Sequence, residues 1–138
     1  MAEHTIKQFD AELENIRSRV LAMGGLVEQQ INNAMKGLLD GDLHCLEQVI
    51  INDQRVNRHE VELDEACAHI IAKRQPAAVD LRMVMMVIKT ITDLERIGDE
   101  AKKIAKRGRA IHGAETGVLP RIDLTSMADN VEIGRAHV

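Results

Sequence analysis

Residues 6–27 of the chain read IKQFDAELENIRSRVLAMGGLV, and this stretch decides the fold class. Its apolar residues recur at alternating steps of three and four, at Ile6, Phe9, Leu13, Ile16, Val20, Met23 and Val27. Such a seam is typical of a helix that packs lengthwise against other helices. The spacing predicts a first helix over residues 5–39, which ends at the break in residues 40–42. Gly24 and Gly25 inside it indicate a close helix contact or a slight bend.

Two further helices are expected over residues 43–74 and 78–110. Pro76 disfavours a helical conformation at Gln75 and so ends the second helix, and Gly113 is expected to cap the third. The second seam, in which two acids interrupt the apolar stripe, consists of Leu46, Val49, Asp53, Val56, Glu60, Leu63, Cys67 and Ile70. The buried face expected for the third helix contains Leu81, Val84, Met85, Ile88, Ile91, Leu94, Gly98, Ala101 and Ala105. Short connections force successive helices to alternate in direction, so the sequence predicts an all-α antiparallel three-helix bundle.

The chain is expected to divide into three parts, of which residues 1–113 form the bundle. Residues 114–119 are polar, and Pro120 can open a fourth helix that is cut short, so residues 114–131 are interpreted as a linker and the start of that helix. The last seven residues, 132–138, read EIGRAHV, like an in-frame translation of a sequencing adapter. Our hypothesis is that this tail is not native.

Composition narrows the function classes. A hydrophobic content of 45% can form a core without disulfides, and Cys45 and Cys67 lie too far apart along one helix to pair. The net charge of -4 and the lack of Trp and Tyr argue against nucleic acid as a partner. The most apolar run, residues 81–91, is too short to span a membrane, although peripheral contact stays open. With no secretion signal at its start, the chain is expected to be cytoplasmic.

Glu95 and Asp99, in the stretch DLERIGD at residues 93–99, are the sharpest candidate for chemistry. They lie four residues apart and therefore share a helix face. Asp53 and Glu60 add carboxylates to the second seam, where a bundle normally places Leu or Val. Clustered carboxylates suit hard cations such as Mg, Mn or Fe. Metal binding by these four acids is therefore one interpretation.

Ordinary ion pairs are the other interpretation of these acids, because buried carboxylates need partners of some kind. The candidate cations are Arg55, Arg58, Lys89 and Arg96. A separate basic cluster lies at the end of the third helix, and it has two interpretations. Its side chains compensate the helix dipole on an exposed face, or they contact acidic lipid headgroups or an acidic partner surface. It consists of Lys102, Lys103, Lys106, Arg107 and Arg109.

Enzyme signatures are not found in the sequence. There is no glycine-rich phosphate loop, nucleophile elbow or zinc signature, and four of the six histidines, at positions 44, 59, 69 and 112, follow no ligand pattern. The chain is therefore expected not to be an enzyme.

Several separate stretches resemble the PhoU family. QFDAELE at 8–14 and MGGLVEQQ at 23–30 look like its first helix, DEAC at 64–67 and IIAKRQP at 70–76 like the end of its second, and DLR at 80–82 and LERIGD at 94–99 like its third. The resemblance covers about residues 5–110. Because members of this family contain two similar three-helix repeats, the chain is similar to the first repeat plus the start of the second, the N-terminal half.

The resemblance implies a negative regulator of phosphate uptake and phosphate-starvation signalling, not an enzyme. Such a protein acts as an adaptor between the ATPase of a phosphate ABC transporter and a sensor histidine kinase, and the full-length form is expected to be a homodimer. The metal-binding motif of the family maps onto Glu95 and Asp99, and less firmly onto Asp53 and Glu60. A purely structural bundle without metal and a carboxylate-bridged metalloenzyme are the alternatives, and metal analysis separates them.

Overall fold

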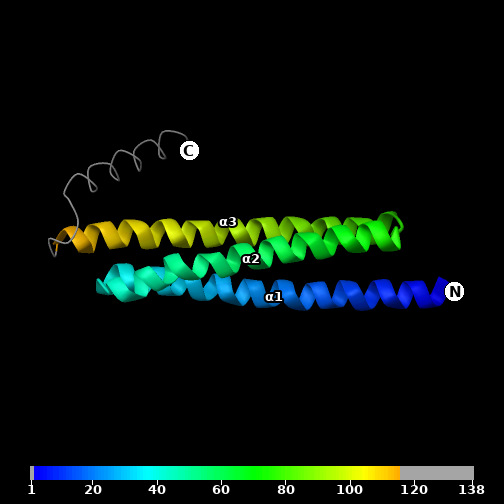
Figure 1. The fold of residues 1–138 in the computed structure, drawn as a ribbon, viewed down its shortest axis with the longest axis horizontal. Helices are drawn as coiled ribbons and strands as arrows, with labels where there is room; N and C mark the ends of the chain where they lie inside the picture. Colours follow the sequence, from blue (N-terminus) through cyan, green and yellow to red (C-terminus); the bar gives the residue numbers. More distant parts are fainter. Residues whose placement is uncertain (1, 116–138) are drawn as a thin grey trace, which may run out of the picture.

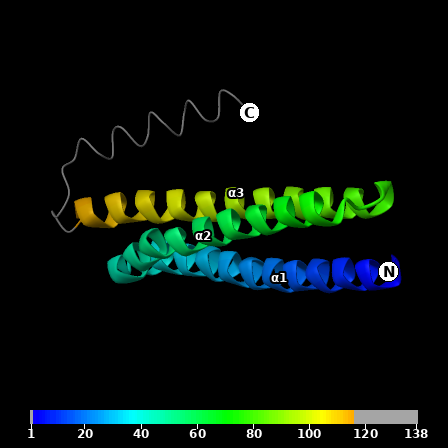
Figure 2. The same ribbon diagram turned by 45° about the vertical axis from the view of Figure 1, so that its right-hand side comes forward.

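Three helices make up the part of the chain described by the computed structural model, residues 2–115. They are α1 (Ala2–Asp40), α2 (Leu43–Arg74) and α3 (Ala78–Glu115). They run side by side in an up-down-up arrangement, which confirms the antiparallel three-helix bundle (Figures 1 and 2). The expected linker and fourth helix after residue 115 and the tail at 132–138 lie outside the described residues. In residues 2–115 no helix is long and apolar enough to cross a membrane.

Two tight turns set the helix ends as the sequence predicts. Gly41 has a φ of 69°, and the side chain of Asp42 accepts a hydrogen bond from the Cys45 backbone N–H at 3.1 Å, which caps the start of α2. At the other end Gln75 adopts the left-handed conformation, and its N–H donates to the Ile71 carbonyl at 3.1 Å. Pro76 follows directly, so α2 has the predicted bounds.

The end of α3 differs from the prediction. The helix continues through Gly113 to Glu115, so Gly113 is not its cap, and α3 passes the expected boundary at residue 113. The last turn is held against the end of α1, because a ring nitrogen of His112 lies 2.6 Å from the Leu38 carbonyl oxygen. That carbonyl belongs to the last turn of α1, where no further helical N–H reaches it. Packing at this end therefore outweighs the tendency of glycine to end a helix.

The core runs along the bundle axis and contains the predicted seams. Its largest cluster consists of Phe9, Leu13, Ile16, Met23, Val27, Val56, Leu63, Cys67, Ile70, Val84 and Ile91. Two predicted core positions are wrong: Met85 is 54% exposed because it lies one position past the buried Val84, and Ile6 is 59% exposed because it precedes the level at which α2 ends. Cys67 is buried, and burial raises the pKa of its thiol, as befits a small core side chain.

Candidate functional site

Asp53 is the buried acid of the predicted site. Its residue surface is 3% exposed, and Lys102 on α3 places its Nζ 3.5 Å from Oδ2. Asn57, one turn along α2, donates from Nδ2 to the same oxygen at 3.3 Å. The other oxygen, Oδ1, is buried without a hydrogen-bond partner. Such an orphaned carboxylate oxygen is costly, so it marks a place where a water or a cation would be stabilised.

Glu60 and Glu95 face each other two turns further along the interface of α2 and α3. Burial raises the pKa of Glu60, and the nearby carboxylates of Glu95 and Asp64 raise it further. In the part of the chain that the structure describes, neither Glu60 nor Glu95 takes part in an ion pair. Two neighbouring carboxylates without a cation destabilise the fold by repulsion. Such an arrangement is typical of a binding site.

Asp99 completes the predicted set but is neutralised within its own helix. Lys103, one turn on, places its Nζ 3.3 Å from Oδ2 of Asp99. Within residues 2–115 no group of three or more His, Cys, Asp or Glu side chains is placed to hold a metal ion. The four predicted acids therefore fit a metal only in part: Glu60 and Glu95 come together, Asp53 has one free oxygen, and Asp99 is engaged by an ammonium group.

The ion-pair interpretation is correct for Asp53, but the partner was misidentified. None of the four cations suggested by the sequence pairs with the predicted acids, and Lys102 takes that place. Lys102 belongs to the basic cluster at the end of α3, and Lys103 pairs with Asp99 and Glu100. Two of the five cationic side chains are thus already matched by acids, which weakens the interpretation of the cluster as a lipid-binding surface.

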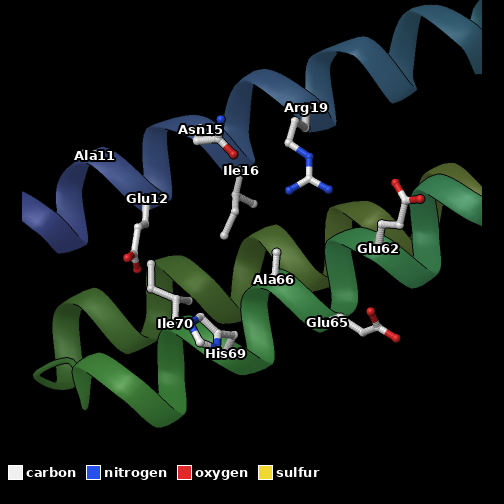
Figure 3. A pocket seen from close by; sticks show the side chains of 10 residues that line it. All are labelled: Ala11, Glu12, Asn15, Ile16, Arg19, Glu62, Glu65, Ala66, His69 and Ile70. Carbon is white, nitrogen blue, oxygen red and sulfur yellow. The ribbon is translucent and has the colours of Figure 1, made fainter.

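A groove between α1 and α2 is a second candidate that the sequence did not indicate. Its floor is apolar, with Ile16 and Ile70, and charged side chains from both helices surround it (Figure 3). The complete lining is Ala11, Glu12, Asn15, Ile16, Arg19, Glu62, Glu65, Ala66, His69 and Ile70. The lining contains three carboxylates, against the guanidinium of Arg19 and the imidazole of His69, so its charge argues against an anion as ligand.

Arg74 closes one end of this groove and was not anticipated either. Its Nη2 lies 2.6 Å from Oε1 of Glu12, its Nε donates to Oε2 at 3.3 Å, and its Nη1 donates to Oε1 of Gln8 at 2.8 Å. The hydrogen bonds from this guanidinium lower the pKa of Glu12. The contact fastens the end of α2 to the start of α1. The only sequence signal for this contact is the RQP stretch that ends α2. A sequence does not show that the Arg74 side chain extends across to α1.

Comparison with known proteins agrees with this architecture. Residues 20–108 match the family model described as PhoU domain. A phosphate-specific transport system accessory protein PhoU homolog from Pseudomonas aeruginosa is 50% identical over 121 residues, which are 88% of this chain and 49% of that protein. A crystal structure of PhoU from P. aeruginosa matches with a TM-score of 0.75 and 49% identity, over 77% of this chain and 51% of that one.

A more distant structure shows the same fold. The phosphate transport system regulatory protein PhoU from Streptococcus pneumoniae matches with a TM-score of 0.68 and 32% identity, over 72% of this chain and 47% of that one. Fold and motifs together define an all-α three-helix-bundle domain, and the relatives that it matches are named accessory or regulatory proteins. The chain belongs to the PhoU family. It spans about half the length of the curated relatives that it matches.

Proposed function

We propose that the protein containing this chain is a negative regulator of phosphate uptake and of phosphate-starvation signalling. The observation that carries the proposal is family membership at 50% identity to a phosphate-specific transport system accessory protein. The names of these relatives describe accessory and regulatory proteins, which supports a role other than catalysis. A cytoplasmic location, where the ATPase of a transporter is reached, is part of the proposal.

The proposed mechanism is that of an adaptor. The protein contacts the ATPase of a phosphate ABC transporter with one surface and a sensor histidine kinase with another, and holds the kinase in its inhibitory state when phosphate is plentiful. A rigid bundle suits this role, because two weak contacts at a fixed separation reinforce each other. One repeat alone keeps only one contact and therefore loses the increase in affinity that comes from joining two.

Co-purification tests the adaptor directly. The full-length gene product, tagged and expressed at native level, is expected to retain both the transporter ATPase and the kinase from membranes solubilised after growth in phosphate-rich medium. The 138-residue chain serves as the matched control and is expected to retain at most one of them. Retention of neither partner by the full-length product would contradict the proposal.

We also propose that Glu60 and Glu95 form the metal-facing pair of the predicted set, with Asp53 and Asp99 beside them. The supporting observations are the raised pKa of Glu60, the absence of a cation at this pair among the described residues, and the orphaned oxygen of Asp53. Mg, Mn or Fe would suit such oxygen ligands and would neutralise the paired carboxylates. Residues outside the described part of the chain would have to supply further ligands.

Titration calorimetry with Mn²⁺ tests the metal proposal. Changing Glu95→Ala together with Asp99→Ala is expected to weaken binding more than His69→Ala does, because hard cations prefer carboxylate oxygen. Binding unchanged in the acidic double variant would return these acids to ordinary ion pairs, and no binding by the wild-type chain would favour a purely structural bundle without metal. The ion pair between Asp53 and Lys102 is the specific observation in favour of that alternative.

A further inference from the structure

The two carboxylate oxygens of Asp53 lie in unequal surroundings. A Cβ atom added to Gly98 on α3 would be 3.8 Å from Oδ1, which is buried and has no hydrogen-bond partner. The same Cβ would lie 3.0 Å from Cγ1 of Val56 and 3.8 Å from Cγ2 of Val27, so Oδ1 faces an apolar part of the bundle. Oδ2 accepts a hydrogen bond from Nδ2 of Asn57 at 3.3 Å. A cation that enters from solvent therefore meets Oδ2 before it reaches the buried Oδ1.

The ammonium group of Lys102 already lies at this oxygen. Its Nζ is 3.5 Å from Oδ2 of Asp53, whose side chain is only 5% exposed. Two cations beside one buried carboxylate oxygen repel each other strongly, because water screens their charges poorly there. Lys102 is able to leave, since its side chain is 30% exposed and its long stem can extend into solvent. Binding of a metal ion at Asp53 therefore requires Lys102 to move away.

Lys103 makes a similar contact in an exposed position. Its Nζ lies 3.3 Å from Oδ2 of Asp99 and 3.4 Å from Oε1 of Glu100. The side chains of Lys103 and Asp99 are 49% and 44% exposed, so water screens their attraction. The two neighbouring lysines thus place the same charge near the predicted acids and differ in the burial of the acid they contact. Lys103 is therefore a matched reference for Lys102.

We propose that Lys102 competes with a divalent metal ion for Asp53, so that the ion pair and metal binding at this acid exclude each other. The inference rests on the proposed metal set and adds to it a residue that opposes binding. Because the ammonium group belongs to the same chain, it is present at high effective concentration. Metal binds Asp53 only when that interaction exceeds the ion pair. Lys102 therefore lowers the metal affinity and sets the concentration at which Asp53 is occupied by metal.

Glu60 and Glu95 have no such competitor. They lie two turns further along the interface of α2 and α3, and neither forms an ion pair within residues 2–115. A metal ion can therefore bind this pair while Lys102 stays at Asp53. It follows that a change at Asp53 should affect metal binding only when Lys102 has been removed.

Calorimetric titration of the 138-residue chain with Mn²⁺ tests the competition. Lys102→Met keeps an apolar stem of similar length and is expected to tighten binding about tenfold, because only the ammonium group is lost. Lys103→Met removes the same charge from the exposed pair and is expected to tighten binding about twofold or less. Lys102→Arg keeps the cation and should bind Mn²⁺ as weakly as the wild-type chain. Equal gains in the two methionine variants would indicate general charge repulsion and overturn the proposal.

Asp53→Asn distinguishes direct competition from the effect of a nearby charge. In the wild-type background this change is expected to leave Mn²⁺ affinity nearly unchanged, because Lys102 already occupies the acid. In the Lys102→Met background it is expected to remove the tenfold gain. An equal loss in both backgrounds, or no loss in either, would overturn the proposal. Circular dichroism confirms that each variant keeps its helices.

Urea unfolding provides a readout that does not depend on the affinity of the wild-type chain. Excess Mn²⁺ is expected to raise the urea midpoint of Lys102→Met more than that of the wild-type chain, because the ion replaces the missing ammonium group. A gain for Lys102→Met without any binding by the wild-type chain would support the proposal, and no gain would overturn it. Failure of the proposed metal set shows separately, as Mn²⁺ binding that survives Glu95→Ala with Asp99→Ala.

Discussion

Lys102 on α3 reaches the buried carboxylate of Asp53 on α2, with its Nζ 3.5 Å from Oδ2, and it is the only cation paired with that acid among the described residues. Only 5% of the Asp53 side chain is exposed, against 30% of the Lys102 side chain. The carboxylate of Asp53 therefore lies inside the bundle, whereas the side chain of Lys102 extends from the buried acid toward solvent. Removing the lysine alone leaves that acid uncompensated.

Lys102→Met is expected to destabilise the chain by about 1–3 kcal/mol, because Asp53 keeps its buried charge with only the Asn57 amide as a partner. The double variant Asp53→Leu with Lys102→Met is expected to recover most of that loss. Urea unfolding in the presence of a chelator measures both. A double variant as unstable as the single one would show that the pair is not the source of the effect.

Glu60→Gln is expected to stabilise the chain at pH 7. The pKa of Glu60 is raised in the folded state, so protonation favours folding, and this contribution is lost as the pH rises through that raised pKa. Glutamine stays neutral and avoids the repulsion by Glu95. The gain in the urea midpoint should therefore vanish below the unfolded pKa of about 4.3. Glu62→Gln, an exposed site on the same helix, is the control and should change little at either pH.

The lowered pKa of Glu12 predicts the opposite dependence of stability on pH. Its folded pKa is lowered by the hydrogen bonds from Arg74, so its stabilising effect is present above the unfolded pKa and is lost as the pH falls through the folded value. Glu12→Gln should lower the melting temperature at pH 7, and the difference from the wild-type chain should shrink as the pH falls through that lowered pKa. A difference that stays the same from pH 7 into the acid range would contradict this. The exposed Glu14→Gln serves as the reference.

Gly37→Ala is expected to destabilise the bundle by about 1–3 kcal/mol, although alanine favours helix. A Cβ at this position would lie 2.7 Å from Cδ2 and 2.8 Å from Cγ of Leu46, a fully buried side chain, so atoms at this contact would have to shift. Gly25→Ala, in the same helix but with open space around it, should instead stabilise by about 0.5–1 kcal/mol. Equal effects of the two changes would contradict the close approach of α1 and α2.

Much of the fold could be predicted because local signals agree with the tertiary arrangement. Asp42 and Pro76 set the ends of α2 through backbone geometry alone, and the seam from Leu46 to Ile70 follows from helical periodicity. Periodicity does not say how wide a face becomes buried, which is why Met85 was placed in the core. Nor does it weigh a glycine against packing, which is why α3 passes Gly113.

Partners across helices were harder to predict, because they depend on how far one helix is shifted along the other. The short turn at residues 75–77 contained the missing signal. Asp53 and Lys102 lie equally far along the chain from a point between Ala77 and Ala78, and so do Glu60 and Glu95. In an antiparallel hairpin with a tight turn, such positions face each other. The groove of Figure 3 lies between α1 and α2, and no such spacing pattern in the sequence indicates it.

The regulatory role is tested most directly by a phosphate-starvation reporter in phosphate-rich medium. Deleting the complete gene is expected to raise reporter expression, the complete gene to restore repression, and residues 1–131 alone to leave it raised, because one repeat cannot bridge a transporter and a kinase. Full repression by the fragment would refute the bridging argument. Unchanged expression after deletion of the complete gene would contradict the proposed function itself.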